Sequence, residues 1–204
     1  MTDFYNPYFR DPSLSRRPQN RRDDAWIRAL LGRVQVGRVA TVWEGEGGAA
    51  FPFITPLAFA YRPETHDLVY HTNIAGRLRA NTERSQPACA TFEASELGAL
   101  LPSNDPLELT VQYRSVIAFG LARLLTDPEE AREALRVLSE RVFLGLRVGA
   151  DTRPISDADL ARTAVYSLAI ERWSGKENWP EAAAQTEAWP ALTSDLARAR
   201  PVLG

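Results

Sequence analysis

The stretch LELTVQYRSVIAFGLARLL, residues 107–125, decides the fold class of this sequence. Its many β-branched and aromatic residues favour a strand over a helix. One face of the pleat carries Leu109, Val111, Tyr113, Ser115, Ile117 and Phe119, and the other carries Gln112, Arg114, Val116 and Ala118. Both faces are partly apolar, so we expect both to be covered, one by a barrel interior and the other by a second subunit.

Further segments have the composition of strands. They are VGRVATVWE (36–44), AAFPFITPLAFAY (49–61), DLVYHT (67–72), PACATFEA (87–94) and TAVYSLAIERW (163–173). Pro52 and Pro56 exclude an uninterrupted central ladder in the second of these, which predicts an edge or a bulge. Residues 96–106 are expected to be a loop. Several strands without βαβ alternation predict a mainly β, α+β protein with peripheral helices, built on an antiparallel β-barrel.

Three helices are predicted from their N-terminal signals. Asp23 or Asp24 caps AWIRALLGR, whose apolar residues share one face. Asp127 caps a helix that opens with Pro128. The segment 156–159 resembles a capping box before a short helix.

Length and composition suit one domain with extensions. We expect an irregular arm at 1–22, the barrel domain at 23–178, and a partly helical C-terminal arm at 179–204, packed on the body or on a partner subunit. The basic pairs in the first arm fit either an anion contact or a solvated or partner-packed segment, and a basic run alone favours the second interpretation. The 24 basic and 26 acidic residues do not suggest nucleic-acid binding.

No membrane span is expected, because no apolar run approaches about 20 residues. No secretory signal is expected, because the N-terminal stretch MTDFYNPYFRDP has no apolar core and carries acidic residues and prolines. The single cysteine, Cys89, excludes an intrachain disulfide and favours a reduced, cytoplasmic setting. We expect it to be a small buried strand residue rather than a nucleophile. With two histidines and this one cysteine, no metal site is expected. His66, in the turn RPETHD, is expected to be solvated and inert.

The usual catalytic motifs are missing from the sequence. The best candidate for a ligand-binding site is the stretch VYHTNIAGRLRAN, residues 69–81. Poverty in acid–base groups points to a bound cofactor that brings its own reactivity. Gly76 permits close backbone approach, Arg77 can bind a phosphate bidentately, and Thr72 adds a hydroxyl. A helix starting near Ala75 would add free N–H groups. Taken alone, a Gly-Arg junction is more often surface structure.

The wider order of segments strengthens this interpretation. RVATV (38–42), FITPLAFAY (53–61), YHTNIAGRLRAN (70–81), YRSVIAFGLARLL (113–125) and ERWSGKEN (171–178) occur in that order. Together they resemble the pyridoxamine 5′-phosphate oxidase-like flavin-binding proteins and, within them, the nitroimidazole-resistance (Nim) nitroreductases. The resemblance covers about residues 23–178. It implies a homodimeric split β-barrel of about six antiparallel strands, of the FMN-binding type, with two flavin sites along the subunit interface.

The resemblance also implies site residues. Arg77 would hold the flavin phosphate with help from Thr72. The first strand would run past the cofactor with Arg38, Val39, Ala40 and Thr41. The second strand would present main-chain groups to the isoalloxazine edge from Thr55, Pro56 and Leu57. The second subunit would contribute Tyr113, Arg114 and Ser115, or Trp173 and Lys176. Relatives often carry Arg-Lys at the phosphate, whereas Leu78 follows Arg77 here. Arg79 is expected to point elsewhere and so not to replace this second cation. Without it, the sequence does not decide between FMN and FAD.

His71 matches a histidine that the Nim group places at the end of this strand, facing the cofactor cleft. It is our candidate for substrate contact or protonation, because an imidazole exchanges protons near neutral pH. The alternative is that it only hydrogen-bonds the cofactor or a backbone carbonyl. The leading functional hypothesis is a flavin-dependent oxidoreductase that reduces a small nitroaromatic such as a 5-nitroimidazole. The alternative is a flavin-binding or carrier protein without a substrate. Pyridoxamine phosphate oxidation ranks lower, because the sequence shows no second basic cluster.

Overall fold

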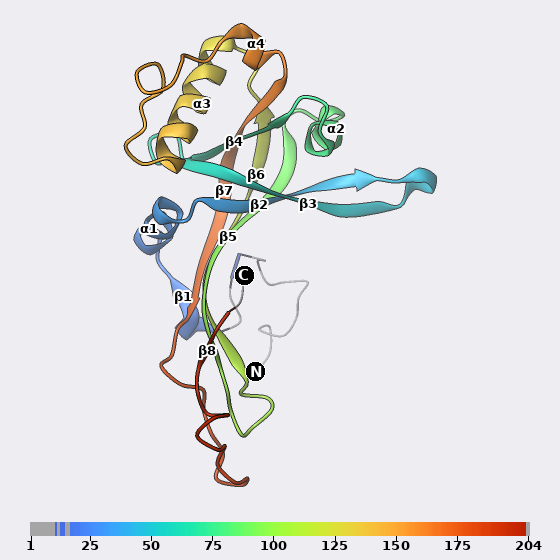
Figure 1. The fold of residues 1–204 in the computed structure, drawn as a ribbon. Coiled ribbons are helices and arrows are strands. Elements are labelled where there is room, and N and C mark those ends of the chain that lie inside the picture. The colour runs from blue at the N-terminus through green and yellow to red at the C-terminus, as the bar shows by residue number, and fades with distance from the viewer. Residues whose placement is uncertain (1–10, 12, 15–16, 203–204) are drawn as a thin grey trace.

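The computed structural model describes residues 11, 13–14 and 17–202, so most of the arm at 1–22 lies outside the described residues. Within them, an antiparallel sheet closes into a barrel in the order β7, β4, β3, β2, β5, β6 and back to β7. These strands are β2 (Val36–Glu44), β3 (Ala50–Arg62), β4 (Asp67–Asn73), β5 (Ala88–Leu101), β6 (Thr110–Leu124) and β7 (Thr163–Asn178). Figure 1 shows β5, β6 and β7 running beyond the barrel as a long extension. The predicted barrel is confirmed.

Helices cover the barrel from outside. They are α1 (Asp24–Arg33), α2 (Arg77–Glu83), α3 (Pro128–Val142) and α4 (Asp157–Leu160). The predicted caps are confirmed: the Asp23 carboxylate accepts from the Trp26 amide, Asp127 accepts from the Glu130 amide, and α4 begins with a capping box. Each cap satisfies backbone donors that the first helical turn leaves free.

Two apolar cores hold these layers together. The barrel interior joins side chains such as Phe59 and Phe92 to the inner face of α1. A second core lies between α3 and the outer face of the sheet, around Val69 and Leu135. On β6, Val116 and Ala118 are fully buried inside the barrel. The face of residues 107–125 with the smaller side chains is therefore the interior one.

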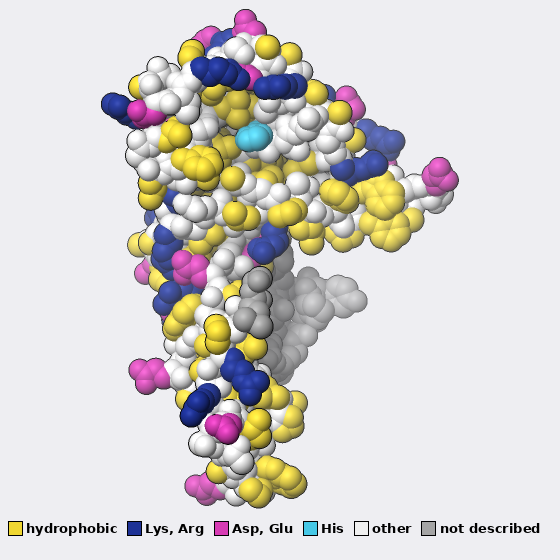
Figure 2. Space-filling view, viewed as in Figure 1, with side chains coloured by type: hydrophobic (Ala, Val, Ile, Leu, Met, Phe, Trp, Pro, Cys, Tyr) yellow, Lys and Arg dark blue, Asp and Glu magenta, His cyan; other side chains and the backbone are white. Residues whose placement is uncertain are grey.

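Strand β3 is an edge strand over most of its length. It pairs with β2 from Ala50 to Ala58, but with β4 only from Phe59 to Arg62. The edge that Pro52 and Pro56 predicted is therefore confirmed, because proline is tolerated where no ladder donor is needed. The hairpin of β2 and β3 projects from the body (Figure 1), and hydrophobic side chains gather along it (Figure 2).

Two boundaries differ from the predictions. Residues 96–101 are not a loop: they continue β5 and pair with β6 across a bulge between Leu97 and Leu100. Strand β7 does not end at Trp173 but runs to Asn178. Gly175 makes no turn there; a Cβ at this position would lie 2.6 Å from Ile27 of α1. The glycine is needed because α1 packs against the strand backbone.

The C-terminal arm is irregular rather than partly helical in its described part. Only β8 (Arg200–Pro201) is regular, and it pairs with β5. Prolines at 180 and 190 deprive the backbone of helical donors, which explains the wrong prediction. Cys89 is exposed, not buried, because it lies on the outward face of β5 between buried alanines. None of the helices among the described residues has the length and apolarity to cross a membrane.

Candidate functional site

The first cavity of interest lies between the distal half of β2 and α2 and has a volume of about 450 Å³. We call it the Arg77 pocket. Its principal polar and aromatic residues are Thr41, Trp43, Arg77, Asn81 and Arg84. The Asn81 amide donates to the Thr41 hydroxyl at 3.0 Å, which ties the helix to the strand. The pocket therefore brings together two residues that the sequence predicted, Thr41 and Arg77.

Arg77 has no ion-pair partner among the described residues. Its guanidinium carbon lies 5.9 Å from the centroid of the Trp43 ring, a cation–π contact that leaves its N–H donors free for an anion. Arg84, by contrast, is bound to Glu44 at 2.6 Å. Arg77 is thus the available cation of the pocket, and Arg84 is a second cation held by a carboxylate.

A tight turn places Thr72 beside Gly76, the residue that precedes Arg77. The Gly76 amide donates to the Asn73 carbonyl at 2.8 Å, and Gly76 is the N-cap of α2. A Cβ on Gly76 would lie 3.0 Å from the Thr72 hydroxyl oxygen and 2.9 Å from the Asn73 carbonyl oxygen. Glycine is needed at this junction because the backbone passes so close to Thr72.

Leu78 and Arg79 do not take part in the pocket. Leu78 is 1% exposed and packs in the barrel core. Arg79 points elsewhere, as the sequence predicted: it lies 3.3 Å from Glu83, and it does not line the pocket. Sequence reasoning missed Arg84 and Asn81. The helical spacing 77, 81, 84 is the signal that could have found them once α2 was placed.

The unpaired edge of β3 lies beyond the point where β4 stops pairing. On that side, none of the described strands pairs with the main-chain donors and acceptors of residues 50–58. Within this segment, the Thr55 hydroxyl oxygen is buried and has no hydrogen-bond partner among the described residues. Opposite β3, Val39 is buried in the core, so it can offer only main-chain groups, while the Arg38 guanidinium is held by Glu93 at 2.8 Å.

His71 and Thr72 lie on opposite faces of β4, because successive strand residues alternate. Thr72 follows Tyr70 on the interior face, whereas His71 follows Val69 on the outer face and is exposed. Desolvation by the surrounding protein lowers the pKa of His71 below its usual range. Its imidazole is therefore less readily protonated than a free histidine side chain, and in the neutral form it has one N–H to donate and one nitrogen to accept.

The second group of predicted residues lies far from the Arg77 pocket in the same chain. On β7, Thr163 pairs with Asn73 of β4, and Lys176 lies 13 residues further along. At about 3.3 Å per strand residue, this separates Lys176 from the Arg77 end by roughly 40 Å. Ser115 is paired with Lys176 on the neighbouring strand. These residues could meet the first group only across two chains.

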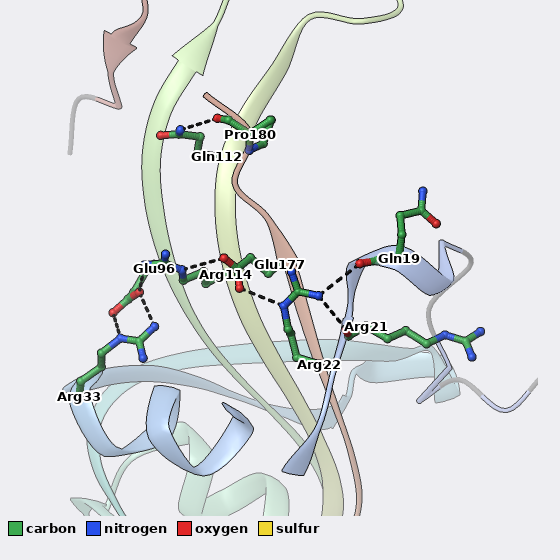
Figure 3. Close-up of polar contacts among 9 residues, drawn as sticks. All are labelled: Gln19, Arg21, Arg22, Arg33, Glu96, Gln112, Arg114, Glu177 and Pro180. Atoms are coloured by element: carbon green, nitrogen blue, oxygen red, sulfur yellow. Dashed lines mark hydrogen bonds and ion pairs between the residues drawn. The ribbon is translucent and has the colours of Figure 1, made fainter. Parts of the chain in front are cut away.

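Arg114 already has partners in its own chain. Glu96 and Glu177 each lie 3.4 Å from its guanidinium, which also lies 4.0 Å from the centroid of the Trp179 ring. Arg33 binds Glu96, and Arg22 binds Glu177, so the ion pairs form a continuous chain (Figure 3). The hydrogen bond from Arg33 holds the pKa of Glu96 below its usual range. The carboxylates that a half-buried arginine requires are therefore intrachain ones.

Trp173 and His66 belong to an aromatic cluster at α1. The Trp173 indole donates to Asp24 at 2.9 Å, and the His66 ring lies edge-on to it at 4.5 Å. His66 also shares a hydrogen bond of 3.0 Å with the Tyr61 hydroxyl. The expectation of a solvated His66 is wrong, because its turn folds back on β7. The described residues contain no cluster of three metal-ligating side chains.

The described residues thus form a closed antiparallel barrel with one open strand edge, on β3, and a polar pocket between β2 and α2 that contains an unpaired arginine. The sequence profile of the family described as pyridoxamine 5′-phosphate oxidase matches residues 23–177, so this chain belongs to that family. No curated protein matches the sequence.

Solved structures share the fold. The flavocytochrome Anf3 from Azotobacter vinelandii is 24% identical, with a TM-score of 0.75 over 96% of this chain and 86% of that one. An FAD and heme binding protein from Mycobacterium smegmatis is 28% identical, with a TM-score of 0.65 over 79% of this chain and 75% of that one. A Bacteroides thetaiotaomicron protein named as a candidate for 5-nitroimidazole antibiotic resistance is 18% identical, with a TM-score of 0.59 over 76% and 84%.

Proposed function

We propose that this chain binds a flavin nucleotide, with the phosphate in the Arg77 pocket and the ring system along the free edge of β3. The observation that carries the proposal is Arg77, a cation without a carboxylate partner among the described residues, in a cavity between β2 and α2. Strand β3, whose outer edge is unpaired among the described residues, is the neighbour of β2 in the sheet. The buried, unpartnered Thr55 hydroxyl on that edge fits the same ligand. The 28% identical neighbour described as FAD and heme binding favours FAD over FMN.

The chain's own residues would bind and orient the cofactor. Arg77 and Thr72 would hold the phosphate, and main-chain groups of Thr55, Pro56 and Leu57 would align the ring. A bound flavin supplies the electrons that none of these side chains can supply. His71 would hold or pass a proton at an imidazole nitrogen. Two chains would pair as a homodimer, which is how Tyr113, Ser115 and Lys176 could approach the flavin.

With a flavin bound, the function we propose is reduction of a small nitroaromatic such as a 5-nitroimidazole. The alternative, a flavin-binding or carrier protein, is favoured by the sequence, which contains two histidines, one cysteine and none of the usual catalytic motifs. Purified protein is incubated with FMN or FAD, desalted, and examined by visible absorption. We expect retained flavin absorbance, and its absence with both nucleotides would contradict the proposal.

Turnover separates the two candidates. The flavin-loaded protein is mixed with a chemical reductant and a 5-nitroimidazole, and loss of the nitro absorbance is followed. The oxidoreductase function predicts turnover that falls in His71→Ala, while flavin retention and the urea unfolding midpoint stay unchanged. Flavin retention without turnover would establish the carrier function. Equal rates in wild type and variant would remove His71 from the reaction.

A further inference from the structure

A second polar cavity lies at the far end of β7 and has a volume of about 550 Å³. It is bounded by the short helix η2 (Pro18–Asn20), the start of β6 and the end of β7. Its principal polar residues are Arg17, Asn20, Glu108, Tyr113 and Lys176. The sequence showed no second basic cluster because these residues come from three segments that only the fold brings together. We call this cavity the Lys176 pocket.

Asn20 is a buried polar side chain without a partner. It is 8% exposed, and none of the described residues hydrogen-bonds its carboxamide. Its polar atoms are not among the fully buried side-chain atoms that lack a partner, so they can be reached by a ligand or water. Because Asn20 lines the Lys176 pocket, its free donor and acceptor are available to whatever occupies that pocket.

Lys176 is the single lysine among 24 basic residues. Its ammonium lies 5.5 Å from the centroid of the Tyr113 ring, and no carboxylate of the described residues is within ion-pair distance. The adjacent Glu177 is taken by Arg22 and Arg114. Glu108 is exposed at the rim of the pocket. A half-buried cation without a counter-charge, beside a free carboxamide, is a binding arrangement for an anion.

We propose that the Lys176 pocket binds an anion of the phosphate or carboxylate class, with the Lys176 ammonium as counter-charge and Asn20 and Tyr113 as hydrogen-bond donors. Two sources share this chemistry. One is a free small anion. The other is the phosphate of a flavin nucleotide in the Arg77 pocket of a paired chain, which would require the two pockets to face each other across the subunit interface, and only this second source rests on the proposed function.

Lysine labelling tests the proposal directly, because one lysine gives one labelled side chain. Full-length protein reacts with a lysine-selective acetylating reagent, and mass spectrometry follows the Lys176 peptide, with the α-amino group as internal reference. Phosphate at about ten times its dissociation constant should slow Lys176 labelling about tenfold and leave the reference unchanged. Asn20→Ala and Tyr113→Phe should weaken this protection, whereas the matched Gln19→Ala should retain it, since Gln19 is exposed.

Further measurements distinguish a free anion from a flavin phosphate, and a failure of this proposal from a failure of the proposed flavin binding. Protection by inorganic phosphate or acetate on flavin-free protein supports a free anion. Protection by FMN or FAD alone supports the flavin phosphate of a paired chain. Equilibrium dialysis with radiolabelled phosphate repeats the first arm without labelling chemistry, and Lys176→Gln should bind less phosphate than wild type. Equal labelling rates with all ligands, together with equal phosphate binding by wild type and Lys176→Gln, would overturn the proposal, whether or not the Arg77 pocket holds flavin.

Discussion

Two arginines near opposite ends of β7, Arg77 in α2 and Arg114 in β6, differ in their ion-pair partners. At the upper end, Arg77 faces a cavity of about 450 Å³ and has no carboxylate partner among the described residues. At the lower end, Arg114 lies between Glu96 and Glu177 and stacks on Trp179. A guanidinium that is already saturated by its own chain stabilises the fold, whereas one that faces a cavity without a counter-charge is available to a ligand. The family resemblance implied that both arginines contact the cofactor, Arg77 from one subunit and Arg114 from the other.

The largest expected effect comes from restoring the basic pair that relatives carry. Leu78 is 1% exposed in the barrel core, so Leu78→Lys buries an ammonium without a partner. We expect a loss of at least about 3 kcal/mol in the free energy of unfolding, measured by urea denaturation. Leu78→Met should cost less than about 1.5 kcal/mol. A stable Leu78→Lys protein with tighter flavin binding would show that position 78 faces the pocket.

Removing Arg114 should weaken the fold rather than the flavin site. Arg114→Ala removes two ion pairs and the contact with Trp179, and we expect the free energy of unfolding to fall by about 1–2 kcal/mol. Arg153→Ala is the matched control: its exposed pair with Asp159 should be worth at most about 1 kcal/mol. Flavin affinity measured alongside should not change. A stable Arg114→Ala protein with weakened flavin binding would instead place Arg114 at the cofactor.

Glu44 offers a way to sharpen the Arg77 pocket. It holds Arg84, the second cation of that pocket, at 2.6 Å. Glu44→Gln should release Arg84 and remove a nearby negative charge, raising flavin nucleotide affinity by about two- to fivefold in a fluorescence titration, equivalent to 0.4–1 kcal/mol. Glu46→Gln on the same hairpin is the control, since Glu46 does not line the pocket. Weaker binding in Glu44→Gln would mean that the Glu44–Arg84 pair is needed intact.

The smallest effect concerns pH. Desolvation lowers the folded-state pKa of His71, so the unfolded chain takes up its proton more readily, at a pKa of about 6.5. The wild-type protein should therefore be fully stabilised above that pH and lose stability as the pH falls below it. His71→Gln should lose less between pH 7.5 and 5.5. Parallel urea midpoints for the two proteins across this range would contradict the lowered pKa.

Much of the fold could be predicted from local signals. Alternation and turn residues located the strands, capping residues located the helices, and Pro52 and Pro56 identified the open edge. The errors lie where tertiary contacts decide. Residues 96–101 become a strand because β6 supplies their hydrogen bonds, and Gly175 continues β7 because α1 packs on its backbone. His66 is packed rather than solvated because Tyr61 and Trp173 surround it.

The candidate site was predicted in part. The structure places Thr41 and Arg77 in one pocket and the Thr72 hydroxyl beside Gly76, the N-cap of α2. It adds Asn81 and Arg84, which depend on the helical phase of a segment too short to show periodicity. The residues expected from a second subunit lie about one β7 length away. Their part in flavin binding stays a prediction that two chains would have to complete.

The most direct test compares FMN with riboflavin, which lacks the phosphate, in fluorescence titrations of wild type, Arg77→Gln and Arg114→Gln. If Arg77 binds the phosphate, wild type should prefer FMN, and Arg77→Gln should lose about ten- to a hundredfold of that preference, with riboflavin affinity unchanged. Arg114→Gln should keep the wild-type preference. The same FMN-to-riboflavin ratio in wild type and Arg77→Gln would contradict the assignment of the phosphate to the Arg77 pocket.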